Sequence, residues 1–125
     1  MKKVLVVEDD RQSRFMLSEM LADLGYERIE ATDGEAAVTT LVEHAGEIAL
    51  VLMDIHMPGK SGVDATGQIR AHSSNPPRDL PIVAVSADRD WQDPDRVKQH
   101  GFTTAISKPI RMSLLRQTLD DLLRA

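Results

Sequence analysis

The stretch Ile48-Ala49-Leu50-Val51-Leu52-Met53-Asp54 is apolar at every position until it ends in a carboxylate. Continuous apolar runs without alternation are typical of strands covered on both faces, as in parallel sheets. A second run, Val4–Val7, ends in the same way at Glu8-Asp9-Asp10. Ligands of open α/β sheets bind at the carboxyl ends of the strands. Two buried strands that both end in carboxylates therefore predict a phosphate or metal site at that edge, rather than a solvated face.

Short apolar runs alternate with amphipathic segments along the rest of the chain. The predicted strands are Val4–Val7, Glu27–Ala31, Ile48–Met53, Pro81–Ser86 and Thr103–Ser107. The predicted helices are Arg11–Leu24, Glu35–His44, Val63–His72, Pro94–His100 and Arg111–Arg124. Five strand–helix units imply a parallel sheet with helices on both faces. Since crossovers are right-handed, we expect one doubly wound, flavodoxin-like α/β sheet of order 2-1-3-4-5. Residues 1–125 are expected to form a single domain.

Composition excludes several classes of protein. The chain has 125 residues, of which 42% are hydrophobic and only 3% aromatic, so we expect an aliphatic core. A net charge of −5 argues against nucleic-acid binding, which usually shows as a basic stripe. The chain has no cysteine, which fits a reducing compartment. No apolar stretch approaches the ~20 residues of a membrane span, and no signal peptide is recognisable. A cytoplasmic protein without membrane contact is the simplest interpretation.

Polar groups follow four of the predicted strands. Glu8 and Asp9 follow the first strand, Asp54 the third, Ser86 ends the fourth and Lys108 follows the fifth. In the order 2-1-3-4-5, strands one, three, four and five are contiguous. We therefore expect these side chains to converge on one cleft.

The chemistry of such a cleft follows from its charges. Carboxylates a few ångströms apart repel by roughly a few kcal/mol near a protein surface, so they take up a proton or a cation. Hard oxygen ligands in an open site suit Mg²⁺. A carboxylate such as Asp54 can accept a phosphoryl group. Lys108 would then offset charge on the transferred group, and the Ser86 hydroxyl would donate to one of its oxygens.

The same residues carry a resemblance to a known family. In their order and spacing, the motifs resemble those of response-regulator receiver domains of two-component systems across essentially the whole chain. The matching segments are Val-Val-Glu-Asp-Asp at 6–10, Leu-Met-Asp-Ile-His-Met-Pro at 52–58, Gly62, Val-Ser-Ala at 85–87 and Ser-Lys-Pro-Ile at 107–110.

The resemblance implies a phosphoacceptor and a metal site. Asp54 would accept phosphate from a histidine kinase or a histidine phosphotransfer protein. Mg²⁺ would be held by Asp9, Asp54 and the main-chain carbonyl of His56, with Glu8 reached through water. The domain would catalyse only its own phosphorylation and dephosphorylation, and would switch or relay a signal to an effector that the sequence does not identify.

The resemblance also assigns Ser86 to the family's hydroxyl position and Lys108 to its lysine. Together with the hydroxyl, the family's switch uses an aromatic residue three positions before the lysine. Here that position is Ala105, and the nearest aromatic residue is Phe102. Our hypothesis is that the signal passes instead through the loop after Ser86 and the segment Trp91–His100, or that the domain only relays phosphate.

Two positions beside the expected site are variable in the family. These are His56, two residues after the acceptor, and Asp88, two residues after Ser86. The resemblance implies that they tune the access of water to the acyl phosphate, and Asp88 is a candidate for orienting that water.

Two other functions compete with the phosphoacceptor. A degenerate receiver would serve only as a protein-interaction domain, although the complete set of site residues argues against it. A phosphohydrolase with an aspartate nucleophile would need a second acid two residues later, where this chain has His56. The sequence leaves open whether the chain acts alone or belongs to a longer regulator or hybrid kinase.

Several residues have a purely structural interpretation. Asp10 is a candidate cap of the first helix, and Trp91 is either a core anchor or an exposed contact. Phe15 is placed on the apolar face of the first helix. We expect core positions for Met16, Met20 and Met112 and surface positions for His44, His72 and His100.

Overall fold

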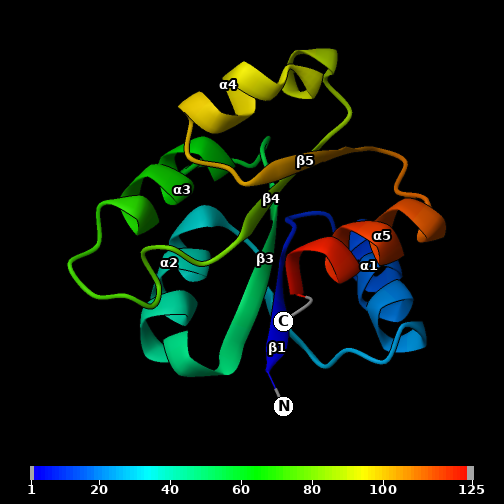
Figure 1. The fold of residues 1–125 in the computed structure, drawn as a ribbon, viewed down its shortest axis with the longest axis horizontal. Helices are drawn as coiled ribbons and strands as arrows, with labels where there is room; N and C mark the ends of the chain where they lie inside the picture. The colour runs from blue at the N-terminus through cyan, green and yellow to red at the C-terminus, as the bar shows by residue number, and fades with distance from the viewer. Residues whose placement is uncertain (1, 124–125) are drawn as a thin grey trace.

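The computed structural model describes residues 2–123, which form a five-stranded parallel sheet in the order β2-β1-β3-β4-β5 (Figure 1). This is the predicted order. The strands are β1 Lys3–Val7, β2 Arg28–Ala31, β3 Ile48–Asp54, β4 Ile82–Ser86 and β5 Thr104–Ser107. Every neighbouring pair is parallel, so the carboxyl ends of all strands lie at one edge.

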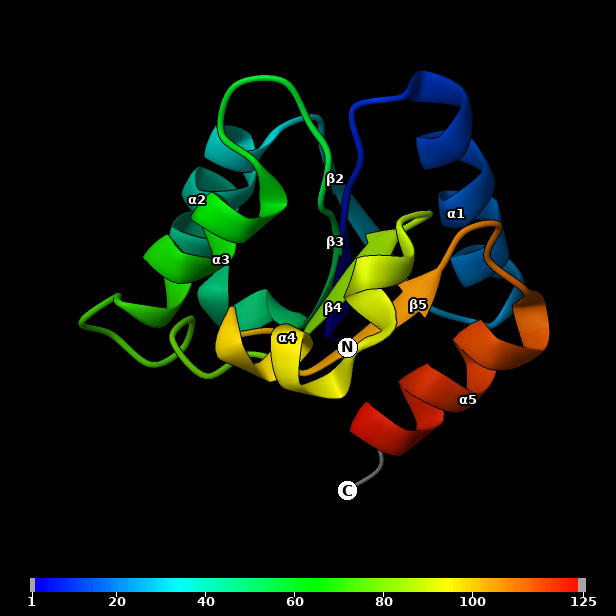
Figure 2. The same cartoon turned by 90° about the horizontal axis from the view of Figure 1, so that it is seen from above.

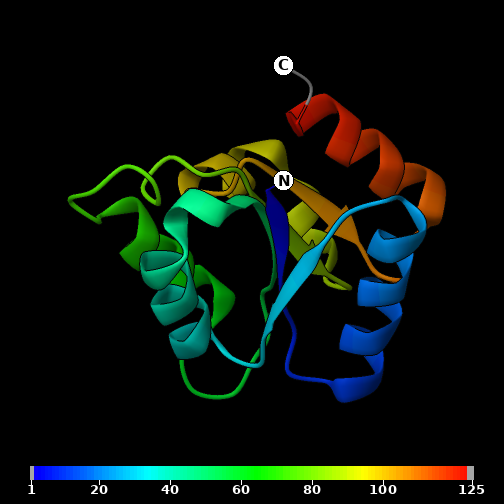
Figure 3. The same ribbon diagram turned by 90° about the horizontal axis from the view of Figure 1, so that it is seen from below.

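Helices cover both faces of the sheet (Figure 2). The five α-helices are α1 Arg11–Asp23, α2 Gly34–Glu43, α3 Gly62–Arg70, α4 Pro94–Gln99 and α5 Met112–Leu123. Seen from below, α1 and α5 lie on one side and α2 and α3 on the other (Figure 3). The last helix was predicted to reach Arg124, which lies outside the described residues.

The two faces bury separate aliphatic cores, because successive strand residues point to opposite sides. In β3, Val51 and Met53 pack in the core beneath α2, α3 and α4, while Leu50 and Leu52 pack in the core beneath α1 and α5. Both cores are built mainly from Val, Leu, Ile and Ala, as the low aromatic content predicts.

Short polar side chains start four of the helices. The Asp10 carboxylate accepts a hydrogen bond from the Ser13 amide at 2.8 Å, so Asp10 is the N-cap of α1. Asp33, Ser61 and Asp93 cap α2, α3 and α4 in the same way. The cap interpretation of Asp10 is therefore confirmed.

The first helix corrects two sequence predictions. Phe15 was placed on the apolar face of this helix and Met16 in the core, but the two residues are 63% and 59% exposed. Leu17 and Leu21, four residues apart, face the sheet and are buried. The prediction was wrong because it accepted every apolar residue of the segment, whereas one face of a helix presents only the positions three or four apart.

A second finding concerns the segment after β4. A 3₁₀-helix, η2 (Arg89–Gln92), precedes α4 and was not predicted, and another, η1 (Ala45–Glu47), precedes β3. Trp91 in η2 is only 4% exposed, which decides its role as a core anchor.

The remaining structural predictions concern histidines and methionines. His44, His72 and His100 are partly exposed, and Met20 and Met112 are partly buried.

Candidate functional site

The polar residues expected at the sheet edge meet there. Asp54 is the last residue of β3, Ser86 is the last of β4, Glu8 follows β1 and Lys108 follows β5. The strand register brings these ends to one level, since Val7 pairs with Met53, Asp54 with Val85 and Ser86 with Ser107. Glu8, Asp54 and Ser86 are each 4% exposed. The convergence of these strand ends, predicted from the strand order, is therefore present in the structure.

Three carboxylates form a cluster at this edge of the sheet. Glu8, Asp9 and Asp54 each offer an oxygen, and these oxygens lie within 4.8 Å of one another. Glu8 and Asp54 are buried, whereas Asp9 is exposed. Burial, together with the hydrogen bond and charge of Glu8, raises the pKa of Asp54 from 3.8 to about 7. The cluster therefore takes up a proton or a cation near neutral pH.

The donor set fits Mg²⁺. Carboxylate oxygens are the ligands that this ion prefers, and an exposed Asp9 beside two buried acids leaves the cluster open toward solvent. The raised pKa of Asp54 reflects repulsion that a cation would relieve. The acidic cluster is therefore suited to a magnesium site.

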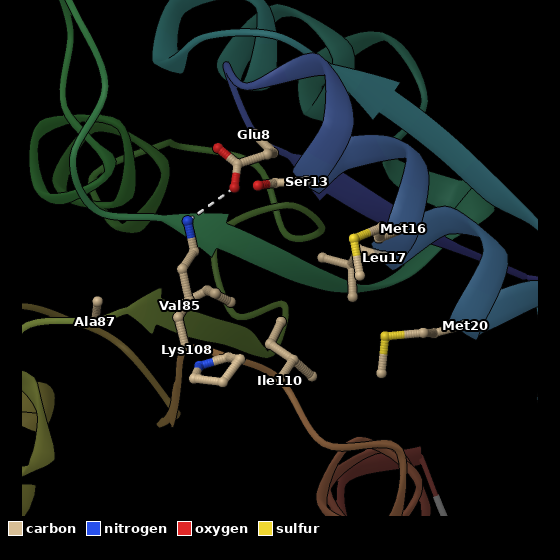
Figure 4. A pocket seen from close by; sticks show the side chains of 10 residues that line it. Glu8, Ser13, Met16, Leu17, Met20, Val85, Ala87, Lys108 and Ile110 are labelled. Atoms are coloured by element: carbon tan, nitrogen blue, oxygen red, sulfur yellow. Dashed lines mark hydrogen bonds and ion pairs between the residues drawn. The ribbon is translucent and has the colours of Figure 1, made fainter.

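Lys108 pairs with the buried acids. Its Nζ donates to Glu8 Oε1 at 2.8 Å (Figure 4) and lies 3.6 Å from Asp54 Oδ1. Burial acts to lower the pKa of Lys108, but Glu8 and Asp54 outweigh it and the net shift is upward. Burial acts to raise the pKa of Glu8, but hydrogen bonds with Asp54 and Lys108 outweigh it, so the net shift is downward. The sequence predicted Lys108 at this edge, but not that its closest partner is Glu8.

A cleft of about 390 Å³ opens beside this pair, between α1 and the segment after β5 (Figure 4). Its apolar wall includes Met16, Met20 and Ile110. The exposed thioether of Met16 thus borders the charged site, which gives α1 a role outside the core.

The loops after β3 and β4 approach each other above the site. His56 Nε2 lies 3.8 Å from Asp88 Oδ2; the His56 side chain is largely exposed, at 64%, and that of Asp88 is partly exposed, at 40%. The Ser86 Oγ accepts a hydrogen bond from the Asp88 amide at 3.0 Å. Ala105, where the resemblance led us to expect an aromatic residue, is half-buried on β5 opposite Ala84.

Two contacts that hold the site were not predicted. A Cβ on Gly62 would overlap the carbonyl oxygen of Asp54 and lie 3.0 Å from Ile55 Cα, so only glycine lets α3 start this close to the end of β3. Arg14 donates to the main-chain carbonyl of Glu8 at 3.0 Å. The sequence marked Gly62 only as part of a motif, and nothing in it indicated Arg14.

Comparison with known proteins agrees with this geometry. The family model of the response regulator receiver domain matches residues 4–120. This chain belongs to that family. This chain is 34% identical to the sensor histidine kinase RcsC of Salmonella typhimurium over 116 residues, which are 93% of this chain. It spans only 12% of the length of that kinase.

Two further relatives match over nearly their whole length. The response regulator DivK of Brucella anthropi is 31% identical over 118 residues, which are 94% of this chain and 93% of DivK. The receiver domain of the sensor histidine kinase PA1611 from Pseudomonas aeruginosa is 28% identical, with a TM-score of 0.85 and coverage of 99% and 98% of the two chains. That structure has a magnesium ion coordinated in its active-site cleft.

The family assignment sets the general role of the chain. It is a receiver domain of two-component or phosphorelay signalling, and such domains partner with histidine kinases or phosphotransfer proteins. Receiver domains are signalling modules rather than conventional enzymes. Among residues 2–123, no helix is both long and apolar enough to cross a membrane.

Proposed function

We propose that Asp54 is a phosphoacceptor that takes its phosphoryl group from the phosphohistidine of a kinase or phosphotransfer protein. The observation that supports this most directly is the placement of Asp54: it is 4% exposed, shares a cluster with two other acids and lies 3.6 Å from Lys108 Nζ. A nucleophilic carboxylate between a cation-binding cluster and a lysine has the groups that phosphoryl transfer requires.

In the proposed reaction an Asp54 oxygen attacks phosphorus. The oxygen–phosphorus bond forms while the phosphorus–nitrogen bond breaks, and the leaving imidazole keeps the electron pair and is neutralised by one proton. The product is an acyl phosphate on Asp54. The protein takes little part in the covalent chemistry beyond the attack by Asp54, so the rate depends mainly on positioning and on stabilisation of charge.

The proposed metal ligands are the carboxylates of Asp9 and Asp54 and the main-chain carbonyl of His56, with Glu8 acting through water. A bound Mg²⁺ supplies neutralisation of charge on the phosphoryl oxygens. Lys108 adds a second positive charge, and the Ser86 hydroxyl donates to a phosphoryl oxygen. In the absence of phosphate, Lys108 is held by Glu8 at 2.8 Å.

We further propose that the phosphodonor protein approaches along α1. The exposed Met16 borders the cleft next to Glu8 and Lys108, and the exposed Phe15 precedes it on α1. We propose that a protein that delivers a histidine to Asp54 covers this end of α1. The proposed setting is the cytoplasm, where kinases draw on ATP.

Loss of the phosphoryl group is proposed to occur by attack of water. His56 and Asp88 flank the acceptor and lie 3.8 Å apart, so they stand where water reaches the site. Asp88 is proposed to orient this water. A dephosphorylation time course of Asp88→Ala that matches the wild type would remove it from the mechanism.

The test is incubation with acetyl phosphate and Mg²⁺, followed by intact-mass measurement. We expect a single phosphoryl adduct on the wild type and none on Asp54→Asn. Asp10→Asn is the matched control, because asparagine keeps the cap of α1 and leaves the acidic cluster unchanged. A wild type without adduct would support a receiver that acts only in protein interaction. Continuous phosphate release at enzyme-like rates would support a phosphohydrolase.

A further inference from the structure

The loop after β4 connects the Ser86 hydroxyl to the only tryptophan of the chain. The Asp88 amide donates to Ser86 Oγ at 3.0 Å, and the Asp88 carbonyl accepts from the Trp91 amide at 3.2 Å. The Asp88 carboxylate accepts from the Asp90 amide at 3.0 Å and so caps η2. Asp88 is therefore bonded both to the hydroxyl of the site and to the start of the 3₁₀-helix that carries Trp91.

The other end of η2 is attached to β5. Gln92 Nε2 donates to Ser107 Oγ at 2.9 Å, and the next residue, Lys108, donates its amide to the Ser86 carbonyl at 3.0 Å. The short helix therefore bridges the ends of β4 and β5. A displacement at Ser86 acts on η2 directly.

Trp91 connects η2 to the surface around α4. Its ring packs edge-on against Phe102, with centroids 5.5 Å apart, and lies 5.3 Å from the ring of His100. The Arg96 guanidinium carbon lies 4.8 Å from the centroid of the Trp91 ring. A movement of the indole therefore acts on Arg96 within α4 and on His100 at its C-terminal end.

A hollow of about 400 Å³ adjoins this ring, between α4, β5 and α5. It is lined by Trp91, Val97, Thr104, Ala105, Ser107 and Leu114, among others. The methyl group of Ala105 leaves this space open, whereas an aromatic side chain at the same position would enter it. The indole therefore has room to move on the face where β5 has no ring.

We propose that Trp91 transmits phosphorylation of Asp54 to the surface formed by α4, β5 and α5; this inference rests on the proposed function of Asp54. A Ser86 hydroxyl that turns to donate to a phosphoryl oxygen leaves the Asp88 amide without its acceptor. Because an amide that loses its hydrogen bond in a partly buried place is costly, Asp88 and the start of η2 shift to restore a partner. Trp91 moves with them toward the hollow. Asp88 is the positioning residue in this route.

The experiment uses the fluorescence of Trp91 in the full chain, with beryllofluoride and Mg²⁺ as the phosphoryl mimic. Fluorine NMR reports binding of the mimic independently in every variant. We expect binding to change the Trp91 emission of the wild type, Ser86→Ala to lose this change while still binding, and Ser86→Thr to retain it. Ser13→Ala, which removes a hydroxyl that lines the cleft on α1, is the matched control and retains the full response.

A second variant tests the hollow itself. Ala105→Phe places a ring beside Trp91, so we expect the emission change to shrink while the mimic still binds. The inference is overturned if the mimic binds the wild type without altering Trp91 emission, or if Ser86→Ala or Ala105→Phe keeps the full change. A wild type that binds no mimic and forms no phosphoryl adduct overturns the proposed function, and this inference with it.

Discussion

Lys108 donates to Glu8 at 2.8 Å and lies 3.6 Å from Asp54, so its hydrogen bond goes to the neighbour of the acceptor rather than to the acceptor itself. The lysine thereby offsets the buried charge of Glu8 and leaves the pKa of Asp54 raised to about 7. Several testable consequences depend on this arrangement.

Removal of the lysine is expected to impair both phosphorylation and folding. In Lys108→Ala, phosphorylation by acetyl phosphate should slow by roughly 100-fold, the usual loss when one stabilising donor is removed. Without Mg²⁺, the free energy of unfolding should fall by about 1–3 kcal/mol, because Glu8 stays buried without its charged partner. Phosphorylation rates and urea denaturation measure the two effects. Lys2→Ala is the control and should change neither, because this exposed lysine precedes β1, at the opposite end of that strand from Glu8.

The raised pKa of Asp54 predicts how stability depends on pH when metal is removed by a chelator. Since the pKa is about 7 in the folded protein and 3.8 as the reference, the folded state binds the proton more tightly. Protonation of Asp54 therefore stabilises the folded state. This stabilisation is fully present below the reference pKa and is lost as the pH rises through about 7. Asp54→Asn lacks this titration. It should therefore be more stable than the wild type at pH 8, by at most about 4 kcal/mol, with a difference that narrows toward pH 4. Denaturation curves at several pH values would contradict this if the wild type were as stable as the variant at pH 8.

Magnesium affinity is expected to depend on Asp9. In Asp9→Asn, the dissociation constant measured by calorimetry should rise tenfold or more, which corresponds to about 1.4 kcal/mol. Asp10→Asn removes an equal charge one residue away but outside the cluster, so its affinity should stay close to that of the wild type. If Asp9→Asn and Asp10→Asn lost equal magnesium affinity, the result would indicate a general effect of charge and would argue against Asp9 as a ligand.

Gly62 offers a direct test of the packing around the acceptor. Gly62→Ala places a methyl group against the Asp54 carbonyl, so the start of α3 must move, at a cost of about 1–3 kcal/mol. Gly67→Ala on the same helix is the control, because its added Cβ would meet no atom within 4 Å apart from its chain neighbours and the nearby backbone of the helix itself. That variant should be stabilised by up to about 1 kcal/mol. Thermal unfolding of both variants decides the point.

The exposure of Phe15 predicts an asymmetry within α1. Phe15→Ser should change the free energy of unfolding by no more than about 0.5 kcal/mol, as for other surface substitutions. Leu21→Ala should cost about 2–5 kcal/mol, because Leu21 is completely buried. A large decrease in the free energy of unfolding of Phe15→Ser would indicate that Phe15 is buried, as its place in the apolar pattern of the sequence suggested.

Most of the fold could be read from local patterns. The unbroken apolar run Ile48–Met53 predicted a strand covered on both faces, and the turn residues around it predicted the neighbouring helices. Strand order followed from the handedness of the connections. The pattern failed for Phe15 and for η2, because a residue's exposure and a single turn of 3₁₀-helix depend on what packs against them.

The sequence by itself determined the sheet and the identity of the groups at its edge. A carboxylate, hydroxyl or amine directly after a buried parallel strand must lie at the carboxyl edge of the sheet. Only the tertiary structure decided which of these groups pair. Lys108 and Glu8 are a hundred residues apart in the chain, and their hydrogen bond depends on the register of strands that local sequence does not encode. The same holds for Trp91, whose burial against Phe102 and His100 and beside the hollow at Ala105 follows from how α4 closes over β5.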